Sequence, residues 1–74
     1  MEERERLGVL LEHWVAHERE HVEQYRSWAE RARGWGAEAV ASRLEEAAAH
    51  ILEAVRCFQR AQEELRPTVP RAAR

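Results

Sequence analysis

The sequence predicts an all-α fold: an antiparallel helical hairpin that dimerises into a four-helix bundle. Residues that break helices are confined to a few positions, with glycine at Gly8, Gly34 and Gly36 and proline at Pro67 and Pro70. Every acidic side chain is Glu and every permanent base is Arg, and alanine is abundant. All three residue types are strong helix formers. Apolar side chains also recur at helical spacing along the two long segments between these breaks.

The first predicted helix covers about residues 3–33 and is followed by a hinge at 34–36. The paired glycines of this hinge suit a helix end and a tight reversal. The second predicted helix covers about residues 37–65, and Pro67 stops it. Because so short a connection joins two long helices, we expect them to pack antiparallel.

Residues 1–66 are therefore expected to form one hairpin domain, followed by a short, basic and disordered tail at 67–74. A core of this size supplies only about 3–5 kcal/mol of net stability. Such a domain usually needs a disulfide, a metal or a partner, and the lone Cys57 excludes an intrachain disulfide.

Each predicted helix carries an apolar stripe that is wider than a two-stranded seam requires. Helical stepping of about 100° per residue gathers on the first helix Leu7, Leu10, Leu11, Trp14, Val15, Val22, Tyr25, Trp28, Ala29 and Ala32, and on the second Val40, Leu44, Ala47, Ala48, Ile51, Val55, Phe58, Ala61 and Leu65. A lone hairpin would leave part of each stripe, including tryptophan, exposed to water, and such patches are normally covered by a partner. The expected partner is a second copy of the chain, related by a twofold axis.

Composition argues against several other partners. The net charge is −2 with neutral histidines and the arginines are scattered, so neither nucleic acid nor a membrane surface is expected. No apolar run approaches the roughly 20 residues of a membrane span, and the charged start MEERER lacks the apolar stretch of a signal peptide. A lone thiol stays reduced in the cytoplasm, which is the predicted location.

The segment HWVAHEREH, residues 13–21, holds three of the four histidines, His13, His17 and His21. A spacing of four on a helix lets two imidazoles reach one ion. Helical stepping places His21 inside the apolar stripe, His17 on its edge and His13 near the rim of the bundle. The alternative reading is a polar stripe with one hydrogen-bonded core histidine.

Glu18 also falls inside the apolar stripe, three residues before His21. A buried carboxylate needs a charge partner, a proton or a metal. Glu-x-x-His is the spacing of di-metal carboxylate bundles, and a dimeric hairpin would duplicate it. With the hinge centred near Trp35, His50 and Glu53 reach the level of this pair. The predicted metal ligands are His13, His17, Glu18, His21, His50 and Glu53.

The sequence specifies no reaction and favours a non-enzymatic role. Its hydroxyl and thiol side chains form no nucleophile constellation, and no glycine-rich phosphate loop follows a strand. The run HWVAH lacks the Glu that follows the first histidine of the zinc-protease motif H-E-x-x-H, which excludes a metalloprotease of that type.

The run LLEHWVAHEREHVEQYRSWAERA resembles a group of short, uncharacterised prokaryotic helical proteins that share a pattern close to H-W-x-x-H-x-x-E-H, followed by an aromatic residue and W-A. The matching positions are His13, Trp14, His17, Glu20, His21, Tyr25, Trp28 and Ala29. The resemblance covers the first helix well and the second only as an Ala/Leu/Glu pattern. It implies that the three histidines act together. The Asn usual after the second histidine of the pattern is Glu18 here.

Two hypotheses of function follow. The first is a cytoplasmic homodimer that binds a transition metal (zinc, nickel, cobalt or iron) through the histidine-rich helix, for storage, delivery or sensing. The second is a structural or adaptor module that forms the same homodimer without metal, its histidines tuning assembly with pH. In a third arrangement, the chain would dock on a larger protein partner.

Overall fold

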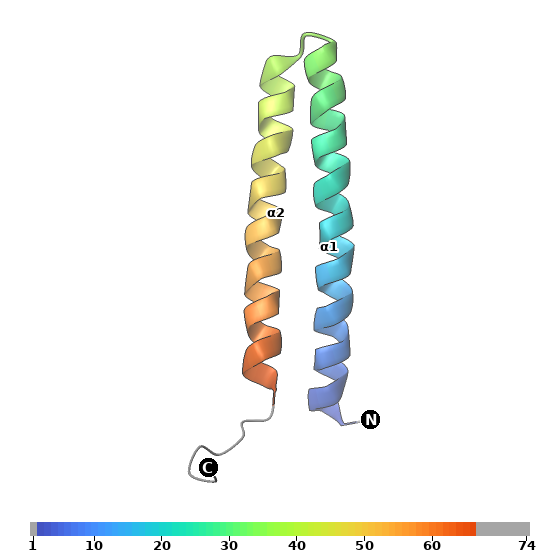
Figure 1. The fold of residues 1–74 in the computed structure, drawn as a ribbon, viewed down its shortest axis with the longest axis vertical. Helices are drawn as coiled ribbons and strands as arrows, with labels where there is room; N and C mark the ends of the chain where they lie inside the picture. Colours follow the sequence, from blue (N-terminus) through green and yellow to red (C-terminus); the bar gives the residue numbers. More distant parts are fainter. Residues whose placement is uncertain (1, 67–74) are drawn as a thin grey trace, which may run out of the picture.

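The computed structural model describes residues 2–66, which form two long helices side by side and antiparallel (Figure 1). Helix α1 spans Glu3–Gly34 and helix α2 spans Glu38–Leu65. No strand occurs within the described range. The predicted all-α hairpin is therefore confirmed. The tail predicted at 67–74 lies outside the described residues.

The turn between the helices depends on one glycine. Gly36 has a φ of 84°, in the left-handed region that costs other residues about 1–2 kcal/mol. The amide of Ala37 then donates to the carbonyl of Ala32 at 2.8 Å, which closes the end of α1. Because Gly36 rather than Gly34 takes the left-handed conformation, α1 ends and α2 begins one residue later than the sequence pattern indicates.

The core is a narrow seam between the helices. Its fully covered side chains are Leu11, Val22, Ala29 and Ala32 on α1 and Ala41, Ala48 and Val55 on α2. The three positions on α2 recur every seven residues, the repeat by which a coiled-coil seam keeps facing its neighbour. Most of the buried residues are alanine, so the helices approach closely but bury little apolar area. No polar or charged residue is buried between residues 2 and 66.

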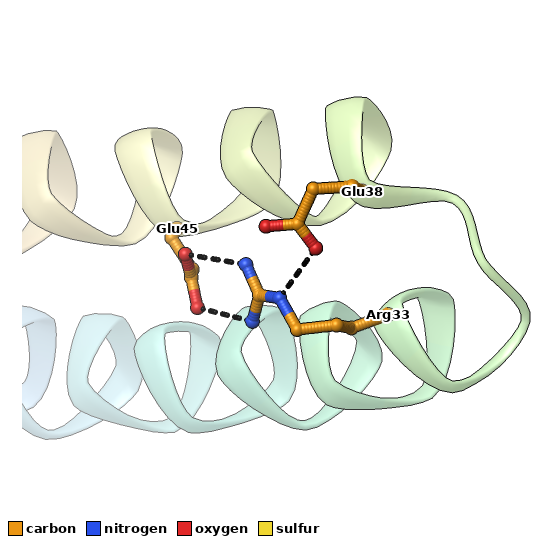
Figure 2. Close-up of polar contacts among 3 residues, drawn as sticks. All are labelled: Arg33, Glu38 and Glu45. Carbon is orange, nitrogen blue, oxygen red and sulfur yellow. Dashed lines mark hydrogen bonds and ion pairs between the residues drawn. The ribbon is translucent and has the colours of Figure 1, made fainter.

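One face of the hairpin carries ion pairs that cross from α1 to α2 near the turn (Figure 2). Arg33 donates from Nε to Glu38 at 2.7 Å and from its two terminal nitrogens to both carboxylate oxygens of Glu45 at 2.9 and 3.1 Å. The hydrogen bonds from Arg33 lower the pKa of the Glu45 carboxyl and in turn raise the pKa of the guanidinium. All three side chains are exposed, so these contacts orient the helices more than they stabilise the fold.

The opposite face is apolar and open to solvent. We define the apolar face as Leu7, Leu10, Trp14, Trp28, Trp35, Val40, Ala47, Ala54 and Ala61. Trp14 reaches across to Phe58 of α2 with ring centroids 5.9 Å apart, which places flanks of both helices on this one face. Trp14, Trp28 and Trp35 keep 38%, 49% and 70% of their surface exposed. The expectation that a lone hairpin leaves tryptophan in water is confirmed.

The apolar stripe predicted for α1 is therefore only partly buried: some of its side chains pack against α2 and others lie on the exposed apolar face. Leu11 and Val22 face α2, whereas Leu10 and Trp28 lie on the apolar face. Within residues 2–66, neither helix has an apolar stretch long enough to cross a membrane.

Candidate functional site

Four aromatic rings follow one another along one flank of α1, each four residues after the last. We call His13, His17, His21 and Tyr25 the histidine ladder. The ring centroids of His13 and His17 lie 5.9 Å apart and stacked, those of His17 and His21 lie 4.7 Å apart edge to face, and those of His21 and Tyr25 lie 5.9 Å apart and stacked. The ladder exists because residues four apart are neighbours on a helix surface.

The ladder runs from solvent toward the seam. His13 and His17 are exposed, and His21 and Tyr25 are half-buried. This gradient agrees with the positions that helical stepping predicts. Tyr25 is absent from the predicted ligands, although the spacing of four that singles out the histidines continues to it.

Glu18 is half-buried rather than buried. The sequence predicts burial of this carboxylate within a four-helix bundle, and in the hairpin Glu18 is half-buried, like His21. Its position near the edge of the seam lets water reach it, so no charge partner or metal is required to offset burial. Glu18 remains three residues before His21, on a neighbouring part of the same flank.

His50 and Glu53 are exposed on α2. His50 follows the buried Ala48 by two residues, which places it about 200° round the helix from the seam. Glu53 pairs with Arg56, one turn further along α2. Counting from the hinge predicts the level of these residues along the hairpin but not the direction in which their side chains point.

Across residues 2–66, no three His, Cys or Glu side chains are placed to hold one metal ion. The predicted convergence of Glu18 and His21 with His50 and Glu53 is therefore not found within the described hairpin. What α1 does bring together is pairs of imidazoles, and the His17–His21 pair is the closest of them.

The His17–His21 pair also has a particular place along α1. Helix α1 spans Glu3–Gly34, so its midpoint lies between Glu18 and Arg19, and the two histidines flank Arg19 symmetrically. His21 also lies in line with the tryptophans of the apolar face, because Trp14, His21, Trp28 and Trp35 follow one another at intervals of seven residues. The pair therefore sits in the middle of the exposed apolar flank of α1.

Comparison with known proteins adds a family but no activity. No curated protein and no solved structure matches the chain. Residues 7–66 match a family described as a domain of unknown function, DUF8180, and the match includes the whole histidine ladder, the turn and all of α2. Since this match covers most of the 74 residues, the chain belongs to the DUF8180 family.

Proposed function

We propose that this protein binds a divalent transition-metal ion through the imidazoles of His17 and His21, with His13 at the margin of the site. The observation that carries the proposal is the 4.7 Å separation of the His17 and His21 ring centroids. Two imidazoles bound to one tetrahedral ion at about 2.0–2.1 Å per bond have centroids about 5 Å apart. Small rotations of these side chains would therefore suffice for both to bind the same ion.

The chemistry of the donors limits the choice of ion. Imidazole nitrogens suit zinc, nickel, cobalt and iron, while magnesium and calcium prefer oxygen ligands. Glu18 is close enough in sequence to His21 to add an oxygen ligand or to accept the N–H of a bound imidazole. We infer storage, delivery or sensing of the ion, in the cytoplasm, rather than catalysis.

We further propose that the chain acts as a homodimer in which two hairpins form a four-helix bundle. The exposed tryptophans of the apolar face support this, since large apolar patches on soluble domains are normally covered. The scarcity of large buried side chains also supports it, because a seam made mostly of alanine supplies little stability by itself.

Isothermal titration calorimetry on the full chain with zinc, nickel and cobalt tests metal binding. We expect a dissociation constant well below about 1 mM for at least one ion. The double substitution His17→Ala and His21→Ala should weaken binding at least tenfold, while His50→Ala should not, because His50 is an exposed residue of α2 and is not part of the imidazole pair. Binding weaker than about 1 mM for every ion, or full binding by the double variant, would overturn the proposal.

The second candidate function is a structural or adaptor module that forms the same homodimer without metal. The exposed side chains of the apolar face support it, since covering apolar surface requires no metal. The two candidates differ in one simple measurement. A melting temperature that neither added metal nor a chelator changes favours the adaptor, and a larger protein that co-purifies in fixed ratio favours docking on another partner.

A further inference from the structure

We propose that a second copy of the chain docks antiparallel on the apolar face, α1 against α1, so that both His17–His21 pairs meet on the twofold axis and bind one metal ion with four imidazoles. The inference rests on the proposed metal binding and adds to it the ligand set, the partner and the register. It begins from the fact that α1 brings histidines together in pairs, whereas structural zinc sites take four protein ligands.

The position of the pair along the helix supplies the register. When two antiparallel helices overlap along their full length, the midpoint of one lies level with the midpoint of the other. The His17–His21 pair is centred on Arg19, within about 1 Å of the midpoint of α1. Full overlap therefore brings His17 of one copy level with His21 of the other, and twofold symmetry doubles two ligands to four.

The size of the apolar face fits a second copy. Helix α1 has 32 residues and is therefore about 48 Å long, and two helices side by side are about 20 Å across. Stacking two hairpins face to face thus covers about 900 Å² per copy, close to the roughly 800 Å² per partner of a stable interface. Only full overlap of the two hairpins covers an area of that size. The same full overlap brings His17 of one copy level with His21 of the other.

The same register matches side chains across the interface. Trp28, which is 49% exposed, lies level with Leu10 of the second copy. The twofold axis repeats this contact, so the interface contains two Trp28–Leu10 pairs. On α2 the facing row is small, with Val40, Ala47, Ala54 and Ala61 spaced at sevens. Small residues at this spacing let the two α2 helices approach closely beneath the larger α1 contacts.

A competing arrangement stacks the hairpins with their turns at the same end. Helix α1 of one copy then packs on α2 of the other, and the two α1 helices lie diagonally across the bundle. Each His17–His21 pair would face the row of Ala47 and Ala54 on α2 of the other copy, where the exposed His50, three residues after Ala47 and four before Ala54, would supply at most one further imidazole. This arrangement covers the apolar face equally well but gives two separate sites, each with two imidazoles from α1 of one copy and at most one from α2 of the other.

Two measurements on the full chain separate these arrangements. The first is the zinc stoichiometry of the dimer, from sedimentation equilibrium and metal analysis, for which we expect one ion per two chains. The second is a pulsed electron paramagnetic resonance distance between spin labels on Ala39→Cys, with Cys57→Ser removing the native thiol. Ala39 is exposed near the turn, so the label should leave the interface undisturbed.

The two arrangements give different label distances. Ala39 lies 12 to 13 residues from the midpoint of α2, so antiparallel stacking separates the two labels by about 38 Å along the bundle. Turns at the same end leave only the bundle width, at most about 25 Å. A long distance with one zinc per two chains supports the inference, and a short distance overturns it.

The remaining outcomes distinguish this inference from the function on which it rests. One zinc per chain, or zinc bound equally well by a monomer, overturns the shared site while leaving metal binding by His17 and His21 in place. A dimer that binds no zinc, nickel or cobalt overturns both. His17→Ala with His21→Ala should abolish binding in the dimer, and His50→Ala should leave the stoichiometry unchanged.

Discussion

The imidazole rings of His17 and His21 meet edge to face with their centroids 4.7 Å apart, at the midpoint of α1 and in the middle of its exposed flank. Of the three ring pairs in the histidine ladder, this one has the shortest centroid separation and the most central position along the helix. The relationship links the proposed metal site to the proposed assembly, and each can be tested separately.

Metal should stabilise the fold through His17 and His21. A ligand that binds only the folded state at a free concentration of about 100 times its dissociation constant adds about 2.7 kcal/mol. We expect zinc at that excess to raise the melting temperature of the wild type and of His50→Ala. The variant carrying both His17→Ala and His21→Ala should show no rise, measured by circular dichroism at fixed chain concentration. An equal rise in all three proteins would place the ion elsewhere.

Trp28→Glu should dissociate the dimer without unfolding the hairpin. Trp28 is 49% exposed on the apolar face, and burying an unpaired carboxylate at an interface is costly. A loss of about 10- to 100-fold in dimer affinity, equivalent to about 1.4–2.8 kcal/mol, is expected. Ser27→Glu is the matched control, because it adds the same charge at an exposed neighbouring position that points away from this face. Analytical ultracentrifugation measures both, and equal affinities would show that this face is not the interface.

Val55→Ala should destabilise the fold by about 2 kcal/mol, because Val55 is fully buried in the seam and each buried methylene contributes about 0.8 kcal/mol before the cavity is counted. Val9→Ala makes the same chemical change at a side chain that is 57% exposed and outside the apolar face. That control should stay within about 0.5 kcal/mol of the wild type. Urea unfolding at one chain concentration gives both values, and a similar loss for the two would contradict the observed seam.

The glycines at positions 8 and 36 should respond in opposite directions to alanine. A Cβ on Gly8 would lie 3.6 Å from Cδ2 of Leu65, an ordinary contact, and Gly8 lies within α1. Gly8→Ala should therefore stabilise by about 0.5–1 kcal/mol. Gly36 has a φ of 84°, so Gly36→Ala should destabilise by about 1–2 kcal/mol. Thermal unfolding of the two variants checks the sign of each change.

The ion pair between Arg33 and Glu45 should contribute a small pH dependence on the acid side. Hydrogen bonds from Arg33 lower the pKa of Glu45 in the folded chain. Its contribution is therefore present above the ordinary glutamate value of about 4.3 and is lost as the pH falls through the lowered pKa. Below about pH 4.3, the melting temperature of the Glu45→Gln variant should depend less on pH than that of the wild type. The Glu20→Gln variant, whose substitution lies away from this ion pair, should show the same pH dependence as the wild type. Parallel melting curves for Glu45→Gln and the wild type would show that the pair is not formed in solution.

Much of the site could be predicted from spacing alone. Residues four apart on a helix are neighbours in any helical fold, so the contact between His17 and His21 follows once α1 is helical. The same reasoning would have included Tyr25, which continues the spacing. Spacing alone could not place His50 and Glu53, which are exposed on α2, because a level along a hairpin does not determine which way a side chain points.

The sequence by itself determined the two helices, the place of the turn and the order of the histidines along α1, because glycine, proline and helical spacing act locally. Only the tertiary structure decided that Leu11 is buried while Leu10 and Trp28 are exposed. The physical reason is that an apolar stripe wider than one seam permits several rotations of a helix about its own axis. Close packing of Ala41, Ala48 and Val55 against α1 selects one of these rotations, and that rotation leaves His17, His21 and the tryptophans on the open face.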